Sequence, residues 1–294
     1  MATIITDLKE TFRRGNIYIQ LIYINVAVFI LTTLTEVMFQ LFNRSIAGVF
    51  EWLELPASVI RFILQPWSLL TYMFMHAGFM HILFNMLWLY WFGALFLSFF
   101  SAKHLRGVYI LGGICGGLLY MAAYNIFPYF RPMTDYSFML GASASVLAIV
   151  AAYLEPNYPI RLLLFGTIRL KYLALIVIGT DLLFITSSNA GGHIAHLGGA
   201  LAGVWFAASL SKGSDLTSWI NKCLDTLVSI VNFKPRKPKM KVHYGTGKQK
   251  DYDYNARKKA QSDEIDRILD KLKKSGYESL TTEEKKSLFD ASKR

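Results

Sequence analysis

Hydrophobic positions gather in long uninterrupted stretches along the first two thirds of the chain, and six stretches approach the length that crosses a membrane. A transmembrane helix needs about 20 consecutive, mostly apolar residues. Backbone polar groups inside lipid must be hydrogen-bonded within the segment, so each stretch predicts a helix. The predicted spans are about 18–38, 78–100, 107–127, 138–154, 171–187 and 193–211.

The segment between the first two predicted spans, about 39–77, is long and partly apolar. It contains FEWLELP and VIRFILQPW, which are too short to span but rich in Trp, Phe and Leu. This composition favours interfacial helices that lie on the outer leaflet.

Polar and charged positions dominate after residue 212. A short amphipathic piece, Leu216–Val231, precedes the Pro- and Lys-rich residues 234–239, which are typical of a linker. A helical period returns from about Asp263, and Thr281 with Glu284 fits a capping box, so a small helical hairpin is expected. A hairpin of this size needs a partner surface for stability.

These patterns predict an all-α polytopic membrane protein with a six-helix bundle and a small cytoplasmic helical tail. The expected parts are an N-terminal segment 1–17, the bundle 18–211, a basic linker 212–262 and the hairpin 263–294.

The composition excludes an ordinary soluble domain. The chain is 53% hydrophobic and only 17% charged, whereas about a quarter of the residues of soluble domains are charged. Residues 212–294 hold 20 Lys and Arg against 12 Asp and Glu, a net charge of +8, and residues 1–211 carry the remaining +3. Beside an apolar body, a basic tail favours anionic lipid or cytoplasmic retention over nucleic acid. We therefore expect the lipid bilayer as a partner and no nucleic acid.

Lys and Arg near the predicted spans indicate the orientation, because they are enriched on the cytoplasmic side. One side receives Lys9, Arg13, Arg14, Lys103, Arg106, Arg161, Arg169 and Lys171, and the other receives Arg44, Arg61 and Arg131. An even number of spans agrees with this distribution. Both termini are predicted to be cytoplasmic, in an integral protein of a bacterial inner membrane.

Polar and ionisable residues inside spans are costly, so they are candidate functional residues. The chain places at membrane depth His81, Asn85, Ser143, Ser145, Asp181, His193 and His196. Ser143 lies in a run of small residues, where a serine often serves packing alone, and His196 could simply bond a neighbouring helix. Together, however, a hydroxyl and an imidazole make a nucleophile and its general base.

The spacing of small residues predicts how these helices meet. Gly199 and Gly203 lie four residues apart on one helix face, and His196 precedes Gly199 by three residues, so His196 is expected to face the helix that carries Ser143. His81 and Asn85 also lie four apart on one face. Both can donate hydrogen bonds to an oxyanion, as can the Ser143 backbone amide, although bonds between helices would explain the pair as well.

Three motifs on successive spans resemble those of the rhomboid family of intramembrane proteases. They are His76-x4-His81-x3-Asn85 in the second span, Gly-x-Ser-Ala around Ser143 in the fourth, and Ala195-His196-x2-Gly199-x3-Gly203 in the sixth. The order of the motifs and the long first loop are similar too, so the resemblance covers about residues 15–211.

The resemblance implies a serine endopeptidase without a cofactor, acting on single-span membrane proteins near the outer end of their spans. It implies a dyad of Ser143 and His196 without a third acidic member, and an oxyanion hole from His81, Asn85 and the Ser143 amide. A water-filled cavity below the outer surface is implied as well, with a lid at about Ser187–Gly192.

The chain departs from the family pattern at two positions. Trp67-Ser68 stands where many members have Trp-Arg, which bears on how the first loop is anchored. Leu147 stands where many members have an aromatic residue packed on the base, so other packing must orient the imidazole. Asp181 is interpreted as a hydrogen-bonding residue inside its span rather than a third catalytic member.

Other functions remain open at this point. A catalytically inactive rhomboid-like protein that binds membrane clients is disfavoured because both Ser143 and His196 are present, and a small transporter or channel lacks an inverted repeat and a charged pathway. His193 and His196 could bind zinc with His76 or His81, but there is no HExxH motif and no suitably placed carboxylate. No metal is therefore expected.

Overall fold

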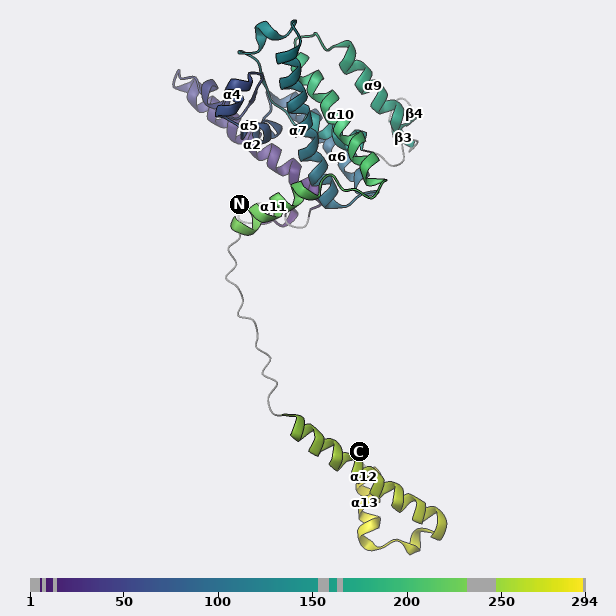
Figure 1. Ribbon diagram of the computed structural model, residues 1–294. Coiled ribbons are helices and arrows are strands. Elements are labelled where there is room, and N and C mark those ends of the chain that lie inside the picture. Colours follow the sequence, from purple (N-terminus) through teal and green to yellow (C-terminus); the bar gives the residue numbers. More distant parts are fainter. Residues whose placement is uncertain are drawn as a thin grey trace. The chain divides into compact units, whose positions relative to one another are not determined.

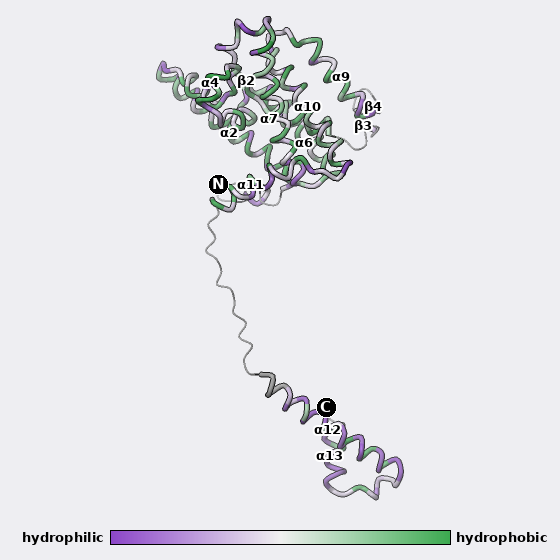
Figure 2. The backbone as a smooth tube through the Cα atoms, viewed as in Figure 1, coloured by the Kyte–Doolittle hydropathy of each residue, from purple (hydrophilic) through white to green (hydrophobic). Residues whose placement is uncertain are grey.

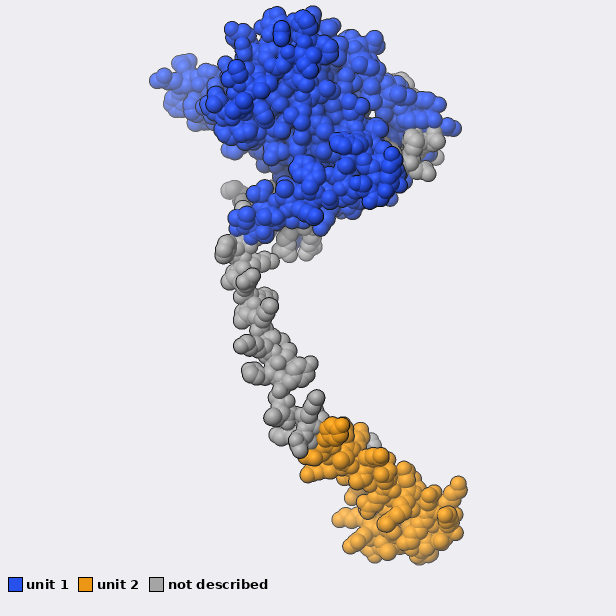
Figure 3. Space-filling view, in the orientation of Figure 1, with its two compact units in different colours: residues 1–232 blue, residues 233–294 orange. Residues whose placement is uncertain are grey.

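The computed structural model describes residues 6, 9–12, 15–152, 159–162, 166–231 and 247–292. The chain divides into two compact units, residues 1–232 and 233–294 (Figure 3). Arg13, Arg14 and residues 153–154 and 234–239, which the sequence predictions include, lie outside the described residues.

The first unit is a helical bundle (Figure 1). Its longer helices are α2 (Ile17–Leu41), α6 (Phe79–Phe96), α7 (Ala102–Ile126), α9 (Leu170–Leu183), α10 (Ala190–Leu210) and α11 (Ser218–Val231). Its shorter helices are α3 (Ala47–Phe50), α4 (Val59–Leu64), α5 (Ser68–Thr71), η1 (Tyr72–Phe74), η2 (Arg131–Met133) and α8 (Ser143–Ala151). Its strands are β1 (Leu55–Pro56), β2 (Phe138–Met139), β3 (Pro159–Leu162) and β4 (Gly166–Arg169).

Four helices among the described residues are long and apolar enough to cross a membrane, namely α2, α6, α7 and α10. They coincide with the first, second, third and sixth predicted spans, and the hydropathy colouring follows them through the bundle (Figure 2). The fourth and fifth predicted spans correspond to the shorter helices α8 and α9. The predicted fourth span is shortened because residues 138–139 form a strand instead, so that α8 begins only at Ser143.

Helices α7, α8 and α10 form the centre of the bundle. Every residue of α8 from Ala144 to Val150 is buried, which fits a helix that is apolar on all sides. A Cβ atom at Gly199 would overlap the carbonyl oxygen of Ala144, and one at Gly203 would overlap that of Ala148. The seam predicted from the spacing of the two glycines is therefore confirmed, and it presses α10 against α8.

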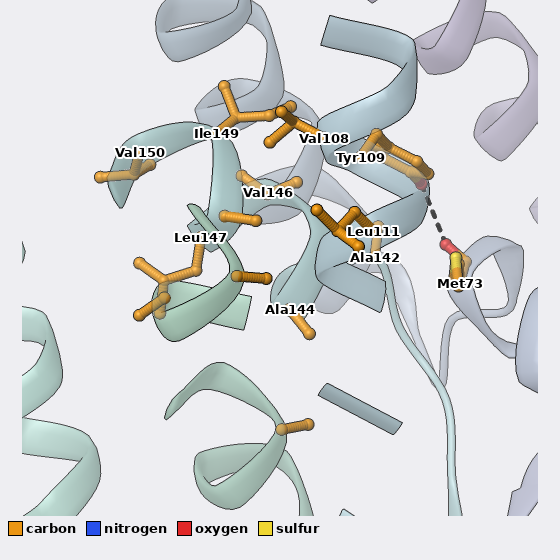
Figure 4. Close-up of a cluster of buried hydrophobic side chains, with 14 of the residues drawn as sticks. Met73, Val108, Tyr109, Leu111, Ala142, Ala144, Val146, Leu147, Ile149 and Val150 are labelled. Carbon is orange, nitrogen blue, oxygen red and sulfur yellow. Dashed lines mark hydrogen bonds between the residues drawn. The ribbon is translucent and has the colours of Figure 1, made fainter. Parts of the chain in front are cut away.

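The core around α8 is closed by side chains of α7 and the first loop (Figure 4). The buried Tyr109 hydroxyl donates a hydrogen bond of 3.1 Å to the Met73 carbonyl, drawn as a dashed line in Figure 4. The Tyr72 hydroxyl likewise donates to the Gly113 carbonyl at 2.7 Å. These bonds tie the segment before α6 to α7.

Two small antiparallel sheets modify the expected all-α architecture, although the described chain is mostly helical. One pairs β1 with β2, in the register Leu55 with Met139 and Pro56 with Phe138, and the other is the hairpin β3–β4. The first sheet joins the first loop to the segment immediately before Ser143. Pairing between residues so far apart in the sequence has no local signal.

The first loop is anchored without the arginine that many family members have. The Gln65 side-chain amide donates to the carbonyls of Glu51 and Glu54 at 3.0 and 3.1 Å. The Trp67 indole donates to the Trp52 carbonyl at 2.8 Å, and the two rings stack with centroids 6.0 Å apart. Gln65 and Trp67 therefore hold the loop through these bonds. Ser68 is fully buried.

One end of the bundle gathers the start of α7 and the helix α11. The Arg106 guanidinium donates two hydrogen bonds to Asn221 Oδ1, at 2.9 and 2.8 Å, and one to Asp225 Oδ1 at 2.8 Å. His104 Nε2 lies 3.6 Å from Asp215 Oδ2. The beginning of the basic C-terminal region therefore lies at the same end as Lys103 and Arg106. This agrees with the predicted grouping of positive charge.

The second unit consists of α12 (Gly247–Ser275), η3 (Tyr277–Ser279) and α13 (Thr282–Ser292). Helix α12 begins before the expected residue 263, because residues with high helix propensity but little apolar character extend it. The predicted capping box is confirmed: Thr281 N–H donates to Glu284 Oε2 at 2.9 Å and Glu284 N–H to Thr281 Oγ1 at 3.3 Å.

Of the predicted apolar face of α12, Ile268 is buried, Ile265 and Leu272 are half-buried, and Leu269 is exposed.

Candidate active site

A cavity of about 420 Å³ opens between α6, α8, α9 and α10. Its lining includes Ser143 of α8, His196 of α10, and His81 and Asn85 of α6. The structure thus brings together all four residues whose side chains the sequence singled out for catalysis. They come from three separate segments of the chain.

The backbone before Ser143 fixes where α8 starts. Gly141 has a φ angle of +131°, which favours glycine, and its N–H donates to the Tyr72 carbonyl at 2.9 Å. A Cβ atom at Gly141 would lie 2.9 Å from the ring of His81. Glycine is therefore required twice over, for the turn into α8 and for the close approach of His81.

The two serines of this segment have different surroundings. Ser143 lines the cavity as the first residue of α8. Ser145 is fully buried on the side that faces α7, and its hydroxyl has no hydrogen-bond partner within the described ranges. Only Ser143 offers its hydroxyl to a molecule in the cavity.

Hydrogen-bond donors line the same cavity as Ser143. Ala77 N–H points at His81 Nδ1 at 3.4 Å, which leaves Nε2 of a neutral imidazole as the protonated, donating nitrogen. The Asn85 amide uses one hydrogen on the His81 carbonyl at 2.9 Å and keeps a second. The Ser143 N–H belongs to the first turn of α8, where amides lack helical partners and the helix dipole is positive.

His76, the first residue of the second-span motif, packs behind His81. The two rings meet edge to face with centroids 5.1 Å apart, and His76 is buried. Neither of its ring nitrogens has a partner in the part of the chain that the structure describes. His76 therefore supports the position of His81.

Asp181 of α9 bonds both histidines of α10. Its Oδ1 atom lies 2.9 Å from His196 Nδ1 and 2.8 Å from His193 Nδ1, and the carboxylate is buried. The expectation that no carboxylate stands near these histidines is wrong. The residues are 12 and 15 positions apart on two helices, a separation that no short motif reveals. The cost of a buried acid inside a span was the only signal in the sequence.

The same three side chains are the candidate for a metal site. Their ligand atoms lie within 4.8 Å of one another, and two histidines with one carboxylate form a familiar donor set. Both imidazoles bond Oδ1 of Asp181, whereas its Oδ2 atom is buried without a hydrogen-bond partner among the described residues.

Part of the cavity wall is aliphatic, and it includes Leu147 and Val177. Asn189 and Gly192 close the cavity from the segment predicted as a lid. Helix α10 begins at Ala190, so the expected lid segment combines turn residues with the first helical turn. No hydrogen bond between Ser143 and His196 is present among the described residues. Catalytic hydrogen bonds often tighten only when substrate binds.

Apolar helices that enclose a cavity with a few polar side chains, Ser143 among them, define a polytopic membrane protein with its candidate site inside the helix bundle. The model of the family described as the rhomboid domain matches residues 64–213, and the chain belongs to this family. A second model, of a family of unknown function (DUF6576), matches residues 248–294.

A curated relative is the RHOMBOID-like protein 12, mitochondrial, of Arabidopsis thaliana. It is 31% identical over 157 residues, which cover 50% of this chain and 47% of the relative. The chain thus spans about half the length of the curated relative that it matches.

Proposed function

We propose that this protein is an intramembrane serine endopeptidase that cleaves single-span membrane proteins near the outer end of their transmembrane segment. The observation that carries the proposal is one cavity lined by Ser143, His196, His81 and Asn85. A nucleophile, a base and two donors within one pocket are the parts that acyl transfer needs.

In this mechanism the Ser143 hydroxyl attacks the scissile carbonyl while His196 accepts its proton at Nε2. The imidazolium then returns the proton to the leaving amine, and water, activated by the same imidazole, releases the acyl group. His81 Nε2, the Asn85 amide and the Ser143 amide stabilise the oxyanion. Each such donor contributes about 10²–10³-fold to the rate in well-studied proteases.

The substrate must enter as an extended strand. A transmembrane helix hides its carbonyls in internal hydrogen bonds, so it has to unwind before Ser143 can reach one. Substrates are therefore proposed to carry small, helix-destabilising residues near the outer end of the span. The aliphatic wall with Leu147 and Val177 suits apolar side chains beside the scissile bond.

The proposed topology has six spans and both termini in the cytoplasm. Four spans are the long helices, and α8 and α9 belong to the other two. The contact of Arg106 with Asp225 supports one common end for the positively charged segments. The three motifs do not distinguish one membrane from another, and the Arabidopsis relative is described as mitochondrial.

The test is cleavage of a model single-span substrate by the purified protein in detergent or liposomes. Wild type is expected to cleave and to react with a fluorophosphonate probe, and Ser143→Ala is expected to do neither. Ser145→Ala is the matched control: it removes a buried hydroxyl two residues away and should cleave like wild type. Equal cleavage by wild type and Ser143→Ala would exclude this mechanism, and an inert wild type would favour the inactive client-binding alternative.

A further inference from the structure

The carboxylate of Asp181 lies where a third member of the catalytic group would orient the base. It contacts His196 at Nδ1 with 2.9 Å between the atoms, on the ring nitrogen that does not serve Ser143. We propose that Asp181 is a positioning residue, which holds His196 in the tautomer and orientation that catalysis requires. This inference rests on the proposed function of Ser143 and His196.

The hydrogen-bond geometry sets the tautomer. An ionised carboxylate can only accept hydrogen bonds. Each neutral imidazole that bonds Asp181 Oδ1 therefore donates its Nδ1–H. The proton of His196 then resides on Nδ1, and its Nε2 keeps a lone pair. Only this tautomer can accept the proton of Ser143.

The charge of Asp181 also acts during the reaction. When Nε2 accepts the serine proton, the ring becomes a cation beside a buried carboxylate, and the low-dielectric surroundings strengthen this attraction. Among the residues that the structure describes, the titratable groups around the ring are Asp181 from α9, His193 from α10 and His81 across the cavity on α6. Asp181 is the one acid among them.

The neighbouring side chains explain why a carboxylate is useful here. Leu147 presents an aliphatic group to the cavity, so it cannot orient the imidazole through a hydrogen bond or ring stacking. His193 lies one helical turn before His196 and bonds the same Oδ1 atom at 2.8 Å. His193 thereby holds the carboxylate in line with His196.

The decisive experiment compares Asp181→Asn with wild type in the full chain. An amide can donate to Nδ1, which would move the proton of His196 to Nε2 and remove its function as base. We expect kcat to fall about a hundredfold or more, with KM changed by less than about twofold. The matched control is Thr180→Val, which removes an exposed hydroxyl that bonds the Ile176 carbonyl of its own helix, and it should keep wild-type kcat.

A spectroscopic measurement tests the tautomer independently of activity. In histidine-¹⁵N NMR of wild type, assigned with a His196→Gln variant, the His196 signal should show the proton on Nδ1. In Asp181→Asn it should show the proton on Nε2. A wild-type proton on Nε2 overturns the inference, even where Asp181→Asn folds poorly.

The remaining outcomes separate the two proposals. If Asp181→Asn keeps wild-type kcat while Ser143→Ala is inactive, the positioning role is wrong and the protease function stands. If Ser143→Ala remains active, the protease mechanism itself is wrong. If purified wild type carries stoichiometric zinc, or a chelator abolishes its cleavage, Asp181 is a metal ligand and the positioning role is overturned.

Discussion

Gly141 connects backbone conformation to chemistry at the scale of one residue. Its φ of +131° turns the chain from β2 into α8, and its missing side chain leaves room for His81. The glycine of the Gly-x-Ser motif is therefore a geometric requirement of the cavity. It places Ser143, the proposed nucleophile, beside His81, a proposed oxyanion donor.

Gly141→Ala is predicted to reduce cleavage and fluorophosphonate labelling by about tenfold or more. A side chain at this φ costs roughly 1–3 kcal/mol, and its Cβ would displace the His81 ring. Both rates can be measured on purified protein. The control is Gly179→Ala in α9, where a Cβ meets no atom within 4 Å, and cleavage should stay at the wild-type level. Unchanged cleavage in Gly141→Ala would contradict the requirement.

At the residue scale, the sequence predicted which side chains share the cavity, because the residue spacing within each motif indicates which helix face they occupy. It did not predict the bond between Asp181 and His196. That bond depends on how α9 returns beside α10, which no short motif encodes. Likewise, the anchors Gln65 and Trp67 of the first loop act through distant carbonyls that only the folded chain brings near.

The helices α7, α8 and α10 show how small residues build the site at the scale of elements. Apolar side chains gain little by leaving lipid for protein, so close packing of backbones has to hold membrane helices together. Gly199 and Gly203 let α10 touch the backbone of α8 directly. The same contact brings His196 within reach of the Ser143 end of α8.

Gly199→Ala is predicted to destabilise the bundle by about 1–3 kcal/mol, because its Cβ would overlap the Ala144 carbonyl. Ala144 follows Ser143, so cleavage should fall as well. Thermal unfolding in detergent, followed together with cleavage, measures both effects. Leu201→Ala on the exposed side of α10 is the control and should keep the cleavage rate. A Gly199→Ala protein as stable and active as wild type would refute the tight contact.

Hydropathy predicted the four long helices well, because the length of an apolar run can be read directly from the sequence. It overestimated the helix at 138–154. Residues 138–139 pair with β1, more than eighty positions earlier, and this distant partner replaces helical hydrogen bonds with a strand ladder. The start of α12 was missed for a different reason: charged residues with high helix propensity form a helix without an apolar period.

The whole molecule combines two units with different sources of stability. The first unit relies on apolar helices and small-residue contacts. In the second, the buried Ile268 and Leu280 supply a small core, and polar interactions at the start of α13 add to it. Lys271 donates to Glu284 at 2.8 Å, and the capping box uses the same carboxylate. All groups of this polar cluster belong to the second unit.

The pKa of Glu284 is lowered from 4.5 to about 2, because Lys271 and then the Thr281 amide donate hydrogen bonds to its ionised form. A lowered folded-state pKa means that the stabilisation is complete above about pH 4.5 and is lost as the pH falls towards 2. At neutral pH, Glu284→Gln should therefore loosen α12 and α13. The neutral amide of this variant can still accept the Thr281 N–H, but it lacks the charge that binds Lys271 and strengthens the cap.

Hydrogen exchange of the full chain at neutral pH measures this effect. Glu284→Gln should exchange faster across residues 264–292. Exchange in the helices of the first unit, and substrate cleavage, should stay as in wild type, because all partners of Glu284 lie in the second unit. Glu283→Gln is the control, since it removes the adjacent charge, for which no ion pair is present among the described residues. Equal loosening by both variants would show that general charge, rather than the Lys271–Glu284–Thr281 cluster, stabilises the hairpin.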